Sequence, residues 1–433
     1  MRRSPLGDDV NVKAMLTMPW LVAFVLLPRV RRRPHWQYRV VRTVDPVHES
    51  PFGLWVLSRH AYVTAALRSP HMGSNEDEAD MSALTAGPLK PFIKRQSQAR
   101  VEGRFVEVID ETMLFRDPPD HTRLRALVSK AFTPRRVEAL AGRVHELVDE
   151  LLEAPAARGR IELMHEFAYP LPARVICELL GVPKEDEAFI VAQAPALGTG
   201  LDPAPMRTPQ SVAAANDATS ALVDYLDGLI AERKLVPRDD LLSALIAAEE
   251  SGESLSHDEL VSTILLLLIA GHETTANLIG NGMLALLRHP DQLARLRAAP
   301  EGADLERSAV EELMRFDGPI QMVERITLEP VVVGGREIPT GRILICLTAA
   351  ANRDPAAFPD PGRLDLTRSP NPHVGFGGGA HFCLGAALAR LEGRIAIGAL
   401  ARRFPRMRLL DPKPEWRPSF TIRGLRSLPL GLS

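Results

Sequence analysis

The sequence predicts a mainly α-helical protein with a minor β region: one domain over residues 34–433, preceded by an extension of residues 1–33. Three observations support this class. One segment, 256–288, keeps a helical pattern for about 33 residues, roughly 50 Å at 1.5 Å per residue. Most other segments are also helical in pattern, and the 36 prolines punctuate them. Extended patterns are few and short.

Composition narrows the functional class. The formal net charge of the 433 residues is −2, so nothing in the charge balance calls for a nucleic-acid partner. A hydrophobic content of 45% is ample for a core. The three cysteines are isolated, which argues against a disulfide framework and fits a reducing cytoplasm.

The N-terminal extension contains an apolar run at 15–28 followed by a basic cluster at 29–33. A membrane-spanning helix needs about 20 apolar residues, so this run is too short. The basic cluster also stands where a signal peptide would have its cleavage site. We expect a helix packed on the domain, with an interfacial membrane contact as the less favoured alternative.

The first half of the chain is helical apart from a short strand at 53–57 and a segment without clear periodicity at 71–115. A loop of that length inside a compact domain is usually functional or disordered. Helices are expected at 35–43, at 60–68, from 117–125 onward, and at 136–152, 172–180, 186–196 and 211–233, with a proline-rich break at 203–209 before the last.

The longest helix begins at a capping box, with Ser256 at the N-cap and Glu259 three residues later. Residues 260–269 are apolar nearly all round, so this helix is expected to cross the core. The segment 270–275 then places a glycine, an acid and two hydroxyls in the middle of this helix. Such residues in a buried helix cost free energy of folding unless they have a function. Either a kink with locally satisfied polar groups or a functional site would explain them.

A further helix is expected at 305–316, and short strands at 331–333 and 343–347. Glu312 and Arg315 are three apart on this helix, a spacing that usually marks an exposed ion pair worth under about 1 kcal/mol. The basic residues that follow Asp117 would ordinarily form a solvated helix face.

The segment 376–385 is the most unusual part of the chain. Four glycines flank Cys383, and a proline-free apolar run from 384 to 400 predicts a helix directly after it. A thiol at a helix start is expected to ionise easily, and Gly377–Gly379 would let the backbone approach something flat and bulky. Cys383 is therefore predicted to be a metal ligand or a nucleophile.

Three other interpretations of this loop remain: a buried structural cysteine, a phosphate-binding glycine loop, and half of a zinc site. Zinc would need nearby partner ligands, but Cys177 and Cys346 are far away in the sequence. The phosphate interpretation lacks the Gly-Lys-Ser/Thr that normally follows such a loop.

The loop resembles the haem-binding loop of the cytochrome P450 family, the haem-thiolate monooxygenases, whose pattern is Phe-Gly-x-Gly-x-His/Arg-x-Cys-x-Gly. Every fixed position matches. The resemblance implies haem b with the Cys383 thiolate as its protein ligand, which pushes charge towards iron and favours O–O cleavage. It also implies haem contacts from Phe376, His381, Leu384 and Gly385.

Other segments resemble further motifs of this family. Residues 270–275 fit its oxygen-activation motif, which implies that Ala270 lies next to the haem and that Glu273 and Thr274 hold a proton-delivering water chain. The His-x-x-x-Arg pattern implies that His121 and Arg125 neutralise haem propionates, together with Arg325 and His381. The resemblance also implies a structural salt-bridge cluster beneath the haem, formed by Glu312, Arg315 and Arg363. Leu364 departs from the pattern, where Phe is commoner.

The resemblance implies insertion of one oxygen atom from O₂ into an apolar substrate, as hydroxylation or epoxidation of a steroid, terpenoid, polyketide or fatty acid. Gln321 and Thr421 would orient one polar group of that substrate. Residues 71–115 would form a mobile segment over the pocket, and 186–233 a lid. The pocket residues implied are Leu266, Ile269, Ala270, Ile320, Gln321, Thr421 and Ile422.

No flavin or nicotinamide fingerprint and no iron–sulfur cysteine cluster is present, so NAD(P)H-derived electrons are expected from outside. The family default is a ferredoxin with its reductase, expected to dock near Arg123 and Arg390 through opposite charge. The alternatives are a peroxide-driven or isomerising haem-thiolate enzyme, against which the acid–alcohol pair argues, and a haem-based sensor, which an attached signalling domain would favour.

Overall fold

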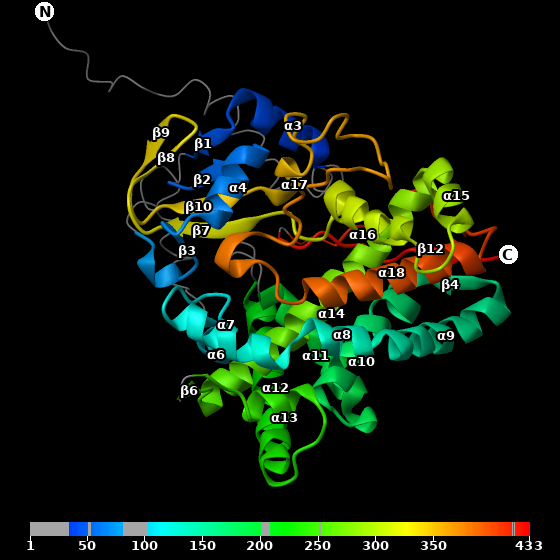
Figure 1. Ribbon diagram of the computed structural model, residues 1–433, viewed down its shortest axis with the longest axis horizontal. Helices are drawn as coiled ribbons and strands as arrows, with labels where there is room; N and C mark the ends of the chain where they lie inside the picture. Colours follow the sequence, from blue (N-terminus) through cyan, green and yellow to red (C-terminus); the bar gives the residue numbers. More distant parts are fainter. Residues whose placement is uncertain are drawn as a thin grey trace, which may run out of the picture.

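The central feature of the fold is the long helix α14, His257–Arg288. The computed structural model describes residues 34–50, 53–80, 103–200, 208–250, 253–417, 419 and 421–433. Within these ranges α14 lies between a part that contains the main sheet and a group of helices on the other side (Figure 1). Its predicted capping box is confirmed, because Ser256 Oγ accepts from Glu259 N and a Glu259 carboxylate oxygen accepts from Ser256 N.

α14 is buried because it carries apolar residues on every side and other helices surround it. It packs against α10 (Pro170–Leu180), α11 (Glu187–Gly200), α16 (Asp304–Asp317) and α18 (Ala386–Arg403). Among the described helices it is the one long and apolar enough to cross a membrane, but 83% of its most apolar stretch is buried inside the protein. It is the core helix that the sequence predicted.

Six of the remaining helices agree with the predicted segments to within a few residues, except that the segment predicted at 136–152 is divided into α8 and α9. They are α3 (His35–Val44), α4 (His60–Arg68), α7 (Asp120–Ala131), α8 (Pro134–Ala139), α9 (Ala141–Arg158) and α12 (Pro209–Leu235). Three others, α13 (Leu241–Ile246), α15 (Pro290–Ala298) and the short α17 (Thr348–Ala351), lie outside the predicted segments.

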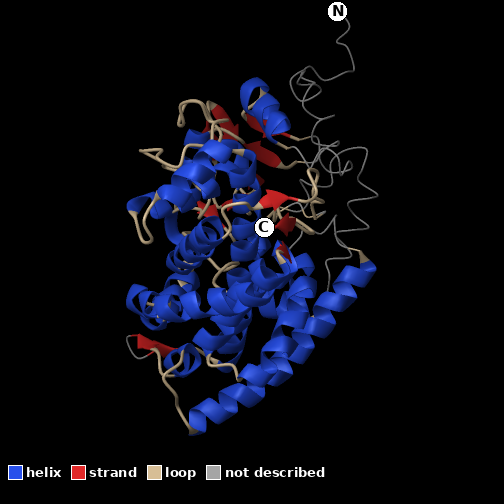
Figure 2. Ribbon diagram, turned by 90° about the vertical axis from the view of Figure 1, so that its right-hand side faces the viewer, coloured by secondary structure: helices blue, strands red, loops and turns tan. Residues whose placement is uncertain are grey.

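The strands gather mainly in one half of the molecule, whereas the other half is helical apart from a short hairpin (Figure 2). The largest sheet has the order β1-β2-β10-β7-β3, with β2 and β10 parallel and the other neighbours antiparallel. Its strands are β1 (Val47–Glu49), β2 (Trp55–Leu57), β10 (Ile343–Cys346), β7 (Val323–Thr327) and β3 (Met72–Gly73).

Within the described ranges, the other β elements form a three-stranded sheet and two hairpins. The three-stranded sheet has the order β11 (Arg408–Leu409), β12 (Pro429–Gly431), β4 (Arg160–Glu162), and so joins the C-terminus to the end of α9. The hairpins are β5 (Glu249–Glu250) with β6 (Glu253–Ser254), and β8 (Val331–Val333) with β9 (Arg336–Ile338).

The helix α6, Arg104–Asp110, was also not expected from the sequence. It lies inside the segment predicted to lack regular structure. It buries Phe105, Val108 and Ile109, and the Asn216 side chain on α12 accepts a hydrogen bond from Phe105 N at 3.0 Å. The helix start is thus stabilised by a residue 111 positions away. The predicted N-terminal helix, residues 81–102 and residues 203–207 lie outside the described part of the chain.

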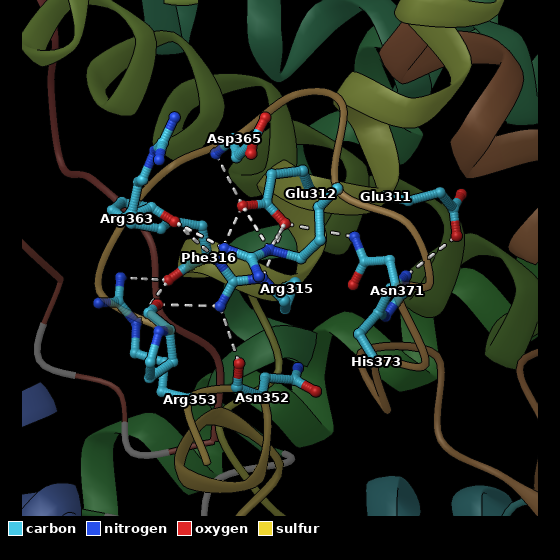
Figure 3. A network of polar contacts seen from close by, with 12 residues as sticks. Glu311, Glu312, Arg315, Phe316, Asn352, Arg353, Arg363, Asp365, Asn371 and His373 are labelled. Carbon is cyan, nitrogen blue, oxygen red and sulfur yellow. Dashed lines mark hydrogen bonds and ion pairs between the residues drawn. The ribbon is translucent and has the colours of Figure 1, made fainter. Parts of the chain in front are cut away.

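A buried ionic network ties α16 to the loop that leads to Cys383 (Figure 3). The Glu312 carboxylate, fully buried, accepts from Arg315 Nε at 2.7 Å and Nη2 at 2.8 Å. Arg368 Nε lies 3.2 and 3.3 Å from its two oxygens. The prediction that Arg363 is the third member was wrong. The Arg363 side chain is exposed, and only its carbonyl takes part, accepting from Arg315 at 3.1 Å.

Candidate active site

Cys383 is held by a tight loop between a short 3₁₀ turn, Gly379–His381, and the start of α18. The Cys383 N–H donates to the Phe376 carbonyl at 2.9 Å, which closes the loop. Gly379 has a φ of +66°, and a Cβ there would lie 2.3 Å from the Leu67 carbonyl of α4. This glycine is therefore required for packing against α4, a role that the sequence analysis did not foresee.

The prediction that the Cys383 thiol ionises easily was wrong for the polypeptide alone. Part of the residue is accessible to solvent. The loop and the helix nevertheless surround most of the sulfur, and this desolvation raises the pKa of the Cys383 thiol. The Gly385 N–H, Arg125 and Arg390 act in the opposite direction without overcoming it. A bound metal cation would supply the missing stabilisation, because it deprotonates a coordinating thiol outright.

Four basic or imidazole side chains predicted as propionate partners meet on this side of the protein. The rings of His121 on α7 and His381 lie 4.1 Å apart, centre to centre. Neither ring nitrogen of His121 has a hydrogen-bond partner among the described residues. Arg125 donates to the Phe382 carbonyl at 2.6 Å, and Arg325 on β7 is 6% exposed.

Electrostatics make this group receptive to an anion. Burial, followed by the charge of Arg125, lowers the pKa of His121, and burial, followed by Arg325, lowers that of His381 to about 3. Burial also lowers the pKa of Arg325. Burial is the largest cause of each shift because it disfavours the charged form, and carboxylates placed between these groups would offset it by stabilising that form.

Two residues that the sequence analysis missed position this group. The Asp117 carboxylate accepts from the backbone N–H groups of Ser74 at 2.8 Å and Asn75 at 3.1 Å. Ser74 Oγ lies 3.3 Å from His381 Nε2, so the segment after β3 is joined to the cysteine loop. The only signal in the sequence was the position of Asp117 before two prolines, which indicated a helix start.

Between its accessible ends, α14 is buried except for three residues in its middle. Ala270 is exposed, and Gly271 and Thr274 are partly exposed. Ala270 and Thr274 are one turn apart on the same face, and Thr274 Oγ1 donates to the Ala270 carbonyl at 2.7 Å. The helix is continuous through 270–275, so this segment is not a break. Ala270, Gly271 and Thr274 form an accessible strip, whereas His272, Glu273 and Thr275 are buried.

Glu273 has a partner that the sequence did not predict. Its carboxylate forms an ion pair with Arg417, which follows α18 and precedes the last strand. Arg417 Nη1 also donates to the Tyr169 hydroxyl at 3.3 Å. No local pattern links residues 144 positions apart.

The predicted pocket residues divide into two groups. Ile320 and Ile422 pair in an isolated β-bridge, and the Thr421 carbonyl accepts from Gln321 N at 2.9 Å, so these residues are neighbours. The prediction that the Gln321 amide orients a substrate was wrong, because that amide accepts from Tyr38 at 3.1 Å and donates to the Gly318 carbonyl at 2.9 Å.

Ile269 lies on the flank of α14, and its place in the substrate pocket stays a prediction. Successive helical residues turn by about 100°, so Leu268 and His272 point roughly opposite to Ala270, and Ile269 stands about 100° away. Ile269 lines a small cavity together with these two residues. The other lining residues are Ala173, Ile176, Ile190, Val191, Ala194, Leu197 and Leu222. Leu266 lies one turn before Ala270 on the same face and is 7% exposed.

The residues present fit a haem group. An accessible thiol, an imidazole with two buried, unpartnered nitrogens and two guanidinium groups are the donor set that an iron porphyrin with two carboxylates requires. Phe376, which is 7% exposed, packs beside the cysteine loop.

Comparison with known proteins gives one consistent result. The sequence model of the family "Cytochrome P450" matches residues 89–419. The chain is 42% identical to cytochrome P450 107B1 of Saccharopolyspora erythraea over 406 residues, covering 93% of each protein. It is 42% identical to the vitamin D(3) 25-hydroxylase of Pseudonocardia autotrophica over 413 residues, covering 92% of this chain and 94% of the hydroxylase.

A solved structure agrees with the sequence matches. The crystal structure of P450BioI in complex with acyl carrier protein carrying hexadec-9Z-enoic acid superposes with a TM-score of 0.84 at 35% identity, covering 94% of this chain and 99% of that one.

Proposed function

Because this chain belongs to the cytochrome P450 family, it is a haem-thiolate monooxygenase, and we propose that its substrate is a mid-sized, largely apolar organic molecule. The overall reaction is substrate RH + O₂ + NAD(P)H + H⁺ → ROH + H₂O + NAD(P)⁺, with two electrons delivered by an external partner. For an alkene the same stoichiometry gives an epoxide. The observation that carries this assignment is Cys383 in a loop that matches every fixed position of the family's haem loop.

We propose that haem b is held by the Cys383 thiolate and that His121, Arg125, Arg325 and His381 bind its propionates. Bound there, the haem iron would activate O₂ for transfer of one oxygen atom. Phe376, Leu384 and Gly385 on the cysteine side and Ala270 on the other would line the macrocycle. The unpartnered nitrogens of His121 support this arrangement.

Thr274 and Glu273 would deliver the protons that oxygen reduction consumes. The Thr274 hydroxyl is partly exposed and now donates to the Ala270 carbonyl, so it can rotate to a water on the accessible side. Glu273 would exchange protons with solvent and pass them towards this hydroxyl through water.

A steroid, terpenoid, polyketide or fatty acid suits the pocket. Ala270, Ile320 and Ile422 supply apolar contact, and the engaged Gln321 amide leaves Thr421 as the polar group available to orient a substrate. A compact charged metabolite would lose hydration there without compensation. The relatives' names agree with this class, because one hydroxylates vitamin D(3) and another binds a hexadecenoyl chain.

Titrating a ligand panel against the haem absorption spectrum tests this proposal. Steroid-sized and long-chain apolar compounds are expected to shift the band at micromolar concentration, whereas compact charged metabolites leave it unchanged. Binding of the charged set alone would refute the substrate class. Product formed per NAD(P)H consumed, measured for the ligands that bind, distinguishes the monooxygenase from peroxide-driven turnover.

We propose a small acidic ferredoxin, reduced by its reductase, as the electron donor, docking on the cysteine side near Arg123 and Arg390. Each arginine already forms an ion pair with an acidic side chain. Arg123 pairs with Glu259. Arg390 donates to the Glu311 carboxylate at 2.6 and 2.9 Å, and its guanidinium lies over the Phe376 ring. They remain 26% and 40% exposed. Docking would therefore compete with these internal pairs.

Charge reversal tests the docking surface. Arg390→Glu is expected to slow the first electron transfer at low ionic strength and to have little effect at high salt, because steering by exposed charges is screened. Arg426→Glu, at an exposed arginine of the C-terminal segment, is the matched control and should leave the rate unchanged. Equal rates for all three proteins at low salt would refute the site.

We also infer that residues 34–433 act as one catalytic domain after the extension 1–33, and that the enzyme works in the cytoplasm. The free, buried thiols of Cys177 and Cys346 support a reducing compartment. A fusion of the chain to a redox-sensitive fluorescent reporter in a bacterial host would test the location.

A further inference from the structure

We propose that Arg417 is a positioning residue for proton delivery: it holds the Glu273 carboxylate at the solvent side of α14 and sets the orientation from which that carboxylate passes protons towards Thr274. The proposal rests on the monooxygenase function above. It adds a residue from the C-terminal segment, outside the motif that contains the acid and the alcohol.

The first support is the contact itself. Arg417 Nη1 contacts Glu273 Oε1 and donates to the Tyr169 hydroxyl at 3.3 Å, so one guanidinium nitrogen joins α14 to the segment before α10. The Tyr169 hydroxyl lies 3.5 Å from the Leu425 carbonyl. Arg417 itself is anchored, because its N–H donates to the Gly424 carbonyl at 2.9 Å.

The second support is the lack of space around the carboxylate. A Cβ built on Gly198 of α11 would lie 2.2 Å from Glu273 Oε2, so this oxygen rests directly against the α11 backbone. Arg417 thus holds one carboxylate oxygen and α11 confines the other. Because Thr274 Oγ1 donates to the Ala270 carbonyl and not to Glu273, transfer from the carboxylate in this orientation would run through water.

The third support is the access to solvent. The Glu273 side chain is 8% exposed and the Arg417 side chain 22%, so the guanidinium stands at the boundary between the carboxylate and water. Tyr169 and the adjacent His272 are two further titratable groups beside Glu273 among the described residues. Burial lowers the pKa of His272 to about 4 and raises that of Tyr169, so both are neutral at pH 7. Arg417 is therefore a positively charged partner placed directly against the Glu273 carboxylate.

The test combines Arg417→Gln, Arg417→Lys and Glu273→Gln, singly and together, in the haem-loaded full-length enzyme. If the pair is coupled, Arg417→Gln lowers the urea midpoint of unfolding in the wild-type background and lowers it much less in the Glu273→Gln background. Arg426→Gln is the control, because its 3.7 Å pair with Glu415 is more than 60% exposed on both sides.

The second measurement separates positioning from mere stability. Arg417→Gln should lower product formed per NAD(P)H by about tenfold and raise the solvent deuterium isotope effect on product formation, since proton relays contribute about 10² to 10⁴ in rate. The reduced, CO-bound spectrum should remain that of a thiolate haem. Arg417→Lys should restore most of the yield because it keeps the charge.

Two results would overturn the proposal. One is an equal loss of urea midpoint in both backgrounds, which would mean that Arg417 and Glu273 are not coupled. The other is coupling in the urea experiment with an unchanged product yield, which would make the pair purely structural. Failure of the wild-type enzyme to give a thiolate-haem spectrum would instead refute the underlying function, and the urea cycle would still report on the pair.

Discussion

Replacing Arg368 tests the ionic network beneath Cys383 most directly. We predict that Arg368→Ala destabilises the protein whereas Arg363→Ala does not. Arg368 Nε lies 3.2 and 3.3 Å from the Glu312 oxygens, Nη1 donates to the Pro359 carbonyl at 2.8 Å, and Nη2 to two further carbonyls. The Arg363 side chain is exposed.

The expected size of the destabilisation depends on the contacts that the Glu312 carboxylate keeps when Arg368 is removed. Removing a single partner from a buried charge costs about 3–5 kcal/mol when the charge is left alone. Here Arg315, Asp365 N at 2.9 Å and Asn371 Nδ2 at 3.3 Å still contact the carboxylate. We therefore expect the loss of a charged hydrogen bond, about 2–3 kcal/mol in the free energy of unfolding. Arg315→Ala removes the main partner and should cost about 3–5 kcal/mol.

Thermal unfolding converts these energies into temperatures. An unfolding entropy of about 2.1 cal/mol/K per residue gives roughly 0.8–0.9 kcal/mol/K for a chain of this length, so Arg368→Ala should lower Tm by about 3 °C. Arg363→Ala, an exposed substitution, should change Tm by under about 1 °C. Haem content, read from the ratio of haem to protein absorbance, should fall in parallel for Arg315→Ala.

Equal destabilisation by Arg363→Ala and Arg368→Ala would refute the reasoning, because it would mean that the exposed guanidinium contributes as much as the buried one. If Arg363→Ala lowered the stability and Arg368→Ala did not, Arg363 would be the third member of the network, as the sequence predicted.

Three further outcomes are expected. Cys383→Ser should abolish the long-wavelength band of the reduced, CO-bound protein, because the anionic sulfur is lost; its survival would disprove the ligand assignment. Thr274→Ala should keep haem and the CO spectrum but release more hydrogen peroxide per NAD(P)H, at about 10² to 10⁴ lower productive rate, and an unchanged product yield would contradict the relay. Burial raises the pKa of Glu311, but hydrogen bonds from Arg390 and His373 prevail and hold it at about 2, against 4.5 unperturbed. A lowered pKa stabilises the folded state above the unfolded value, so the stability lost on Glu311→Gln should be full above pH 4.5 and vanish as the pH falls towards 2; a pH-independent difference measured by urea unfolding would contradict this pairing.

Much of the fold was predictable because its signals are local. The capping box at Ser256 and the apolar run after it specify α14 within a few turns, and α4 has the predicted bounds, His60–Arg68. Helical periodicity and capping depend on residues within four positions of each other, so one sequence displays them. α6 was missed because part of its start is stabilised by Asn216 on another helix.

The candidate site divides in the same way. Cys383 and the polar residues in α14 stand out in the sequence because each belongs to a short pattern with a chemical reason, whereas the His121–Arg125 pair was proposed from the resemblance to the family's motif. The pKa of Cys383 could not be anticipated, since desolvation sums over every neighbour that folding brings to the sulfur.

Only the tertiary structure decided which partners these residues meet. The path of one loop brings Arg368 rather than Arg363 to Glu312, although both precede the cysteine by a similar distance in sequence. The Tyr38 hydroxyl donates to the Gln321 amide although the two residues are 283 positions apart in the sequence. Arg417 pairs with Glu273 across 144 positions. Such contacts depend on the position that each segment of the chain takes when the core packs. No local pattern carries that information, because burial and pairing are properties of the whole folded chain.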